Sequence, residues 1–175
     1  MDPKTLIIHI LGGLGISASI MAFQFKKHGA ILFFRTLNEV LFTLQYFLLG
    51  AYTGMAASVI GCARNIIFKK RVAKGKDTRL FIAVFSLLFF LFGLVFWEGP
   101  KSILIIVAKV LSTVAYGNKN TTVMRLIILV TSTSWLIYNY FVCSIEGVVC
   151  EALTLLSLVI GIVRLDILPK MAKKQ

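Results

Sequence analysis

The stretch LFTLQYFLLGAYTGMAASVIGCARN, residues 41–65, decides the fold. It consists of two apolar runs joined by a short turn at residues 50–54, with aromatic residues before the turn and small residues after it. A related hairpin, SWLIYNYFVCSIEGVVCEALTLLSLVIGIVR, spans residues 134–164 and turns at residues 143–147. The two hairpins predict that one structural unit occurs twice in the chain.

The composition is typical of a membrane protein. Of the 175 residues, 58% are hydrophobic and 15% are charged, whereas a soluble domain is nearer half apolar and a quarter charged. The apolar runs are about as long as a bilayer core is thick. The first run, residues 5–25, has neither a basic leader nor a small-residue cleavage site, so we interpret it as a retained span and not as a signal peptide.

The apolar runs predict an all-α polytopic membrane protein with seven transmembrane helices. Backbone polar groups in lipid must be satisfied within each segment, which favours helices. Proline occurs only at positions 3, 100 and 169, outside all the spans, so no proline kink is expected. Glycines 12, 13 and 15 favour close helix packing in the first span. The expected spans are residues 5–25, 30–49, 53–68, 80–97, 101–116, 122–142 and 145–163.

The basic residues predict an orientation in the membrane. The net charge is +12, but the Lys and Arg residues lie in short loops beside apolar runs, where anionic lipid headgroups are the expected partner and nucleic acid is not. Such loops face the cytoplasm, which places the N-terminus outside and the C-terminus inside. Only Lys4 and Lys101 fall on the outer side. The inner side receives Lys26, Lys27, Lys69, Lys70, Arg71, Lys74, Lys76, Arg79, Lys119, Arg164, Lys170, Lys173 and Lys174.

An internal repeat organises the single membrane domain, residues 1–175. Shifting the chain by about 93 positions aligns Ala22 with Ala115, Phe42 with Trp135, and Gly54 with Gly147. An odd linker helix between two three-helix units gives both units one orientation, so the expected arrangement is 3+1+3 with parallel repeats. The segments are residues 5–71 for the first repeat, 80–97 for a lipid-facing linker, 101–165 for the second repeat and 166–175 for a basic cytoplasmic tail.

Ionisable residues within spans are site candidates because they are costly in lipid. Glu39, next to Asn38, is either a carboxylate facing an internal cavity or the structural partner of Arg35 one turn away. Lys109 lies mid-span, and we expect it to face the same central region as Glu39, with direct contact as a further possibility.

Two more charged residues allow alternative interpretations. Arg64 either extends to the cytoplasmic surface or binds an anionic group entering from inside. Glu151 forms a polar stripe with Thr154 and Ser157, and this stripe should face helices or water.

Aromatic and amide side chains indicate a surface for a solute. Trp135, Tyr138 and Asn139 share one face of the sixth span, and Gln45 and Tyr46 match the last two in the first repeat. Together they would line a cavity suited to a sugar or an aromatic heterocycle. The alternative is an aromatic belt at the outer membrane surface.

Enzyme chemistry is not expected. The histidines at positions 9 and 28 form no metal motif, and the cysteines at 62, 143 and 150 lack C-x-x-C spacing and are interpreted as apolar filler. We therefore expect no catalytic residues, no metal and no cofactor. The leading hypothesis is a carrier for a small polar or aromatic solute, and the alternative is a non-transporting scaffold or accessory subunit. A homo-oligomer is compatible with either hypothesis.

The two hairpins resemble the YgjV family of bacterial inner-membrane proteins. The likeness covers most of the chain and is clearest in Leu48, Leu49, Gly50, Tyr52 and Arg64, and in Trp135, Asn139, Ser144, Ile145 and Gly147. It implies a bacterial inner-membrane location. More distantly, the arrangement is similar to SWEET sugar transporters and PnuC-type vitamin transporters, which implies a site between two helix triads. The helix prolines and the Pro-Gln motif of the SWEET and PQ-loop groups are missing here.

Overall fold

The computed structural model describes residues 2–49, 52–95, 97, 101–141 and 145–172. Within these ranges the chain is all-α, as the sequence predicts. Seven long helices follow one another: α1 (Pro3–Ala22), α2 (His28–Leu49), α3 (Tyr52–Ala73), α4 (Arg79–Val95), α5 (Lys101–Gly117), α6 (Thr121–Phe141) and α7 (Ile145–Ile162). A π-helical turn, η1 (Val163–Ile167), then leads into α8 (Leu168–Ala172).

Two helices continue past the apolar runs that predict them. Helix α3 ends at Ala73 instead of residue 68, because the basic residues after the apolar run continue the helix. The segment expected as a tail after residue 165 continues the helical path of α7 through η1 and α8. Basic residues are good helix formers, so a span's hydrophobic boundary need not be its helical boundary.

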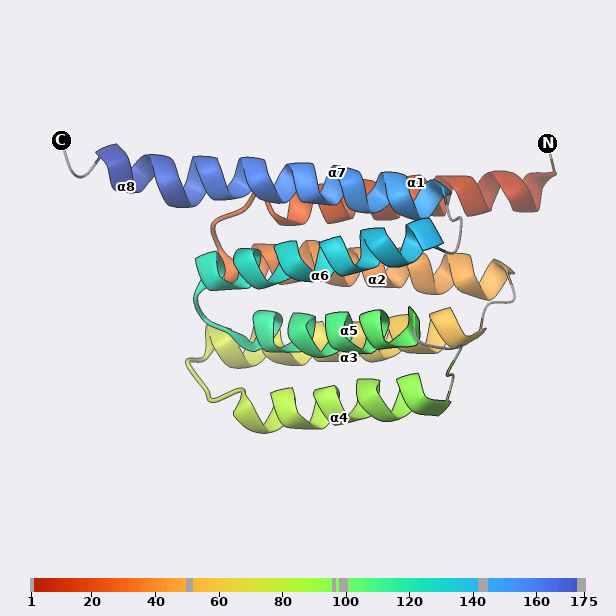
Figure 1. Ribbon diagram of the computed structural model, residues 1–175, viewed down its shortest axis with the longest axis horizontal. Helices are drawn as coiled ribbons and strands as arrows, with labels where there is room; N and C mark the ends of the chain where they lie inside the picture. Colours follow the sequence, from red (N-terminus) through yellow and green to blue (C-terminus); the bar gives the residue numbers. More distant parts are fainter. Residues whose placement is uncertain (1, 50–51, 96, 98–100, 142–144, 173–175) are drawn as a thin grey trace.

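The long helices lie side by side and alternate in direction (Figure 1). Helix α2 packs between α1 and α3, and α6 packs between α5 and α7. Helix α1 also contacts α7, and α3 contacts α5, so these six helices close into a ring. Helix α4 stands beside α5 and touches α3. Neighbouring helices thus cover only part of the surface of each helix.

Close packing of α1 on α2 depends on glycine. A Cβ added to Gly12 would lie 2.8 Å from Gln45 Nε2, and one added to Gly15 would lie 2.9 Å from Phe42 Cε2. Asn38 Nδ2 donates a 2.8 Å hydrogen bond to the Gly15 carbonyl. Gly12 and Gly15 therefore fit the predicted role of small residues, which let helices approach closely. The third of the glycines, at position 13, has open space beside it.

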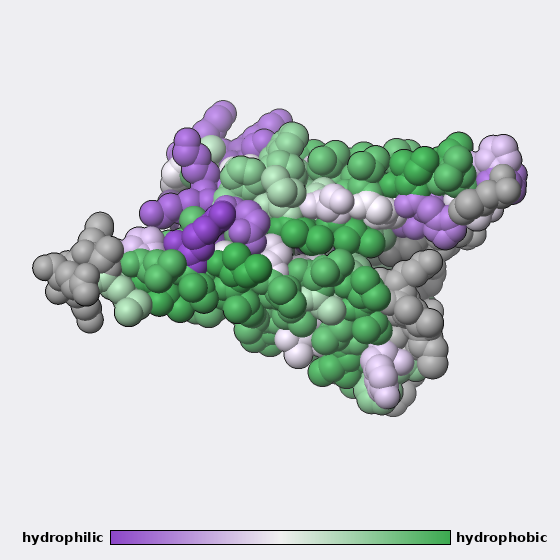
Figure 2. Space-filling model, turned by 90° about the horizontal axis from the view of Figure 1, so that it is seen from above, coloured by the Kyte–Doolittle hydropathy of each residue, from purple (hydrophilic) through white to green (hydrophobic). Residues whose placement is uncertain are grey.

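The outer surface of the helix bundle is strongly apolar. Large hydrophobic side chains are exposed on all seven long helices, including Leu14 on α1, Leu87 on α4 and Leu156 on α7. Figure 2 shows this apolar surface, with a larger group of hydrophilic side chains toward the end that carries the C-terminus and a smaller group at the opposite end. Apolar exposure of this extent is unusual for a soluble monomer.

Some of these helices also have the length and composition of membrane spans. Among the described residues, Pro3–Ala22 and Val148–Ile167 are long and apolar enough to cross a bilayer. Three shorter apolar helices accompany them: Arg79–Val95, Ile103–Gly117 and Thr121–Ile137.

A buried ion pair joins the helix ends where the basic loops lie. Arg125, at the start of α6, is fully buried, and its Nη1 lies 2.9 Å from Asp166 Oδ2 in η1. Thr122 donates a 2.8 Å hydrogen bond to the same carboxylate. The Arg125 guanidinium also donates to the Phe25 carbonyl in the α1–α2 connection. This cluster ties the α1–α2 connection and the start of α6 to η1.

The α3–α4 connection is anchored by backbone contacts. Gly75 has a φ of 65°, a left-handed conformation that glycine adopts without strain, just after α3 ends. Lys119 Nζ donates to the Gly75 carbonyl at 2.9 Å, which links this loop to the α5–α6 connection. The backbone N–H of Arg79 donates to Asp77 at 3.1 Å and holds the pKa of that exposed carboxyl below its ordinary value.

Candidate functional site

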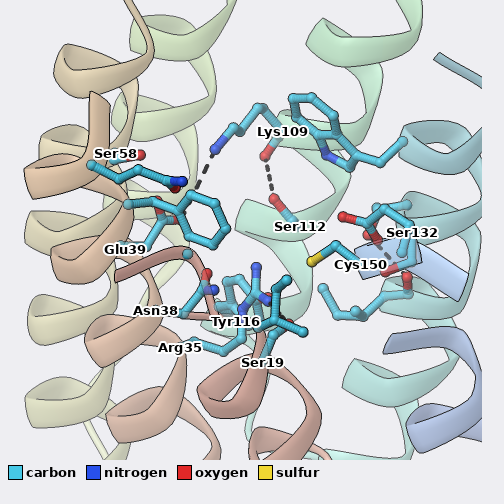
Figure 3. A pocket seen from close by; sticks show the side chains of 18 of the residues that line it. Ser19, Arg35, Asn38, Glu39, Ser58, Lys109, Ser112, Tyr116, Ser132 and Cys150 are labelled. Atoms are coloured by element: carbon cyan, nitrogen blue, oxygen red, sulfur yellow. Dashed lines mark hydrogen bonds and ion pairs between the residues drawn. The ribbon is translucent and has the colours of Figure 1, made fainter. Parts of the chain in front are cut away.

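A cavity of about 520 Å³ lies among the six helices of the ring. Figure 3 shows how side chains from different helices converge on it. Its volume is in the range of sites that bind small molecules. The lining residues are His9, Gly12, Gly13, Ile16 and Ser19 of α1; Arg35, Asn38, Glu39, Phe42 and Gln45 of α2; Ser58 and Arg64 of α3; Lys109, Ser112 and Tyr116 of α5; Ile128, Thr131, Ser132 and Trp135 of α6; and Cys150 and Glu151 of α7.

Glu39 is the centre of a charge cluster in this cavity. Its Oε1 lies 3.8 Å from Arg64 Nη2 and 3.9 Å from Lys109 Nζ. The sequence predicts that Glu39 and Lys109 face one region, and in the structure they form an ion pair (Figure 3). The Glu39 side chain is 7% exposed. One acid from α2 is thus shared between two cations, one from α3 and one from α5.

Arg64 is held inside the bundle and does not extend to the membrane surface. It is 1% exposed, so the predicted alternative of an interfacial arginine is wrong. Its Nε donates to Asn65 at 3.1 Å, and its Nη1 donates to Ser112 and Thr113 of α5, each at 3.2 Å. With Glu39 these partners occupy most of its donors, which is what a buried guanidinium requires.

Aromatic rings complete the surroundings of the two cations. The Arg64 guanidinium carbon lies 4.8 Å from the ring centre of Tyr116 and 5.3 Å from that of Phe89. Lys109 Nζ lies 5.4 Å from the Phe89 ring and 5.7 Å from the Trp135 ring. These are cation–π distances. Phe89 belongs to α4, so the expectation that this helix only faces lipid is wrong on its buried side.

Arg35 is placed differently from the other two cations. Its Nη1 donates to Ser19 of α1 at 2.8 Å, and its guanidinium lies 5.8 Å from the Tyr116 ring centre. The predicted structural pair with Glu39 does not form, because Glu39 pairs with Arg64 and Lys109. The Arg35 Nε is buried and has no hydrogen-bond partner among the described residues.

The predicted polar stripe on α7 faces other helices. Thr154 and Ser157 are buried, and the Thr154 hydroxyl lies 3.3 Å from the Ser19 hydroxyl of α1. Gln24 donates to the Ser157 hydroxyl at 2.8 Å. Glu151 reaches the cavity, where Ser132 of α6 also forms part of the lining. The stripe therefore joins α7 to α1 and ends in a second cavity carboxylate.

Three of the residues predicted to bind a solute lie beyond what the structure describes. The side chains of Tyr46, Tyr138 and Asn139 are outside the described part of the chain, as is the whole of Cys143. Trp135 and Gln45 line the cavity, and Gln45 also donates to the Ile8 carbonyl at 3.3 Å. Asn38 also lines the cavity, although its side-chain amide donates a hydrogen bond to the Gly15 carbonyl of α1. The two remaining cysteines are free thiols, and Cys150 lies on the cavity wall.

Many lining residues come in pairs separated by the offset of about 93 positions that relates the two hairpins. Glu39 on α2 corresponds to Ser132 on α6, and Phe42 corresponds to Trp135. Equivalent positions on two parts of the chain therefore contribute to the same cavity. The remaining pairs are Ile16 with Lys109, Ser19 with Ser112, Arg35 with Ile128, Asn38 with Thr131, and Ser58 with Glu151.

Sequence reasoning missed several contributors to the site. Phe89, Ser112 and Tyr116 carry no charge, and nothing in their local sequence separates them from ordinary helix residues. The offset between the hairpins was a usable signal for others: applied to Glu39 and Ser19, it points to Ser132 and Ser112, both of which line the cavity. A repeat offset is thus a better guide to a shared cavity than residue type alone.

Comparison with known proteins identifies the family. Residues 6–168, nearly the whole chain, match the family Imp-YgjV, described as bacterial inner membrane protein. The search of curated proteins and the search of solved structures each find no match. The apolar exterior and the apolar helices agree with a membrane location. The chain belongs to the YgjV family of bacterial inner membrane proteins.

Proposed function

We propose that this inner membrane protein is a carrier for a small solute, which binds in the cavity among the six helices of the ring. The observation that supports this proposal most strongly is the cavity itself, lined by polar, charged and aromatic side chains from both ends of the chain. A scaffold has no need of an internal polar cavity, because polar groups are costly to bury in a membrane bundle. No covalent chemistry is part of the proposal.

The carrier is built as two three-helix repeats with α4 as the linker. The paired lining positions support this arrangement, since a two-fold axis along the membrane normal brings equivalent positions to one cavity. The helix contacts support it as well, because the α1–α7 contact corresponds to the α3–α5 contact under the same rotation. The distant likeness to SWEET and PnuC-type carriers belongs to this proposal.

The orientation that we propose has the N-terminus outside and the C-terminus in the cytoplasm. The connections after α1, α3 and α5 lie at the end that carries the C-terminus (Figure 1), and they contain most of the loop Lys and Arg residues. Basic loops stay on the cytoplasmic side, where they meet anionic headgroups.

A reporter at the C-terminus tests this orientation. A fluorescent protein that matures only in the cytoplasm should be bright when fused after residue 175, and alkaline phosphatase fused there should be inactive. The opposite pair of results would reverse the topology and place the basic loops outside.

A ligand screen tests the carrier proposal. Purified protein is heated with sugars, nucleosides and vitamins, and a bound ligand should raise the unfolding midpoint. At one hundred times its Kd, such a ligand adds about 2.7 kcal/mol to the free energy of unfolding. Trp135→Ala should abolish the shift, because Trp135 forms part of the cavity wall. Trp97→Ala is the matched control, since Trp97 is exposed and belongs to none of the seven long helices.

The same ligand should then enter proteoliposomes that contain the protein, and Trp135→Ala should slow its uptake. A ligand that binds but is not taken up would favour the alternative function, an accessory or scaffold protein that senses the solute. A shift that survives Trp135→Ala would place the binding site elsewhere.

A further inference from the structure

The described lining of the cavity has an excess of positive charge. Three cations line it, Arg35, Arg64 and Lys109, against two carboxylates, Glu39 and Glu151, which leaves one positive charge unbalanced. A net charge inside a membrane bundle is costly unless a partner of opposite charge is present.

Two of the three cations already have their acid. Arg64 and Lys109 share Glu39, and Arg64 is further bonded by Asn65, Ser112 and Thr113. Lys109 is more open, with 19% of its side chain exposed.

Arg35 is the cation with unused capacity. Ser19 accepts one of its hydrogen bonds, and within the described residues no carboxylate oxygen lies within ion-pair distance of it. Its buried Nε has no partner there either. A guanidinium presents donors in a planar fork that matches a carboxylate. Arg35 therefore has donor capacity left for an anion.

The charges are not repeated across the pseudo-symmetric positions. Arg35 corresponds to Ile128, Lys109 corresponds to Ile16, and Glu39 corresponds to Ser132. Each of these charged positions is matched by a neutral one, so the cavity presents different groups to the two ends of a solute. Such an arrangement orients a solute as well as attracting it.

We propose that the cavity binds a small organic carboxylate carrying a single negative charge, with its carboxylate on Arg35 and its apolar body against the rings of Phe42 and Trp135. This deepens the carrier proposal and rests on it. A carboxylate at Arg35 neutralises the excess charge of the cavity lining. Lys109 adds attraction from the facing helix, and the cavity volume of about 520 Å³ accommodates such a molecule.

The test compares anions with their neutral analogues. The unfolding midpoint of the purified protein is measured with sodium acetate and sodium benzoate, with acetamide and benzamide, and with sodium chloride and sodium phosphate as inorganic anions. The carboxylates, benzoate most, should raise the midpoint, and the amides should not. In Arg35→Gln the affinity for benzoate should fall at least about tenfold, because a charge-assisted fork is lost.

The matched control is Arg164→Gln. This arginine is exposed and donates to the Gln24 carbonyl at 2.8 Å, outside the cavity. It should keep the benzoate shift unchanged. Arg35→Gln should also leave the ligand-free midpoint unchanged or raise it, since it removes a partly buried cation that has no carboxylate within ion-pair distance among the described residues.

Each other outcome overturns a definite part. If amides stabilise the protein as well as carboxylates do, and Arg35→Gln retains the effect, the solute is neutral and only the carboxylate proposal fails. If chloride or phosphate replaces benzoate in an Arg35-dependent way, the cavity takes inorganic anions. If no anion shifts the midpoint, or if Arg35→Gln lowers the ligand-free midpoint, Arg35 has a structural role and the carboxylate proposal fails. If the neutral solutes also leave the midpoint unchanged, the carrier proposal fails as well.

Discussion

Replacing Asp166 with asparagine is expected to lower the free energy of unfolding by about 3–5 kcal/mol. The change leaves the fully buried guanidinium of Arg125 without its acid, although Nη1 lies 2.9 Å from the carboxylate in the native protein. Breaking one side of a buried ion pair costs far more than removing the whole pair, because the remaining charge stays desolvated. In a domain of this size the unfolding midpoint should fall by roughly 10 °C.

The measurement is thermal unfolding of the purified protein in detergent. Asp2→Asn is the control, because Asp2 is exposed and its side chain caps no helix N–H. The double variant Arg125→Met with Asp166→Leu should recover most of the loss, since it removes both charges and fills the space with apolar atoms. Recovery is incomplete because the Phe25 carbonyl loses its guanidinium donor. If Asp166→Asn unfolds like the native protein, the pair does not hold α6 to η1.

Replacing Glu39 with glutamine is expected to have the next largest effect, a loss of about 3 kcal/mol. Glu39 is the shared acid of Arg64 and Lys109, at 3.8 Å and 3.9 Å. The loss should be smaller than at Asp166, because Arg64 keeps its hydrogen bonds to Asn65 and to the α5 hydroxyl groups. The variant also raises the net charge of the cavity lining by one.

Two readouts separate the structural and the binding role of Glu39. In thermal unfolding, Glu39→Gln should lose stability, and adding Lys109→Met should restore part of it by removing one unpaired cation. In the benzoate titration, Glu39→Gln should bind the anion more tightly, in contrast to Arg35→Gln. Equal stability of Glu39→Gln and native protein would mean that Arg64 is held by its neutral partners alone.

The membrane character of the chain follows from sequence for a simple physical reason. Apolar runs such as residues 80–97 are too hydrophobic and too long to be left in water. In a bilayer each run must satisfy its own backbone hydrogen bonds, so it forms a helix whatever its neighbours are. The observed helices follow the predicted spans except at ends such as Ala73, where basic residues extend a helix beyond its apolar part. Glu39 and Lys109 could also be selected from sequence, because a charge in an apolar run is conspicuous.

The partners of those charges were decided only by the tertiary structure. Helix periodicity predicts that Glu39 pairs with Arg35, which lies one turn away on the same helix. In the structure Glu39 pairs instead with Arg64 and Lys109, on two other helices. Which of several cations reaches one acid depends on helix rotation and spacing, and here glycines such as Gly15 set the close approach of α1 to α2. Residue types and their periods determined which helices form and where the charges are along the chain. No local pattern encodes the ring of helices, and it is this ring that decided which charges meet. It also left Arg35 on the cavity lining with one donor unpartnered among the described residues.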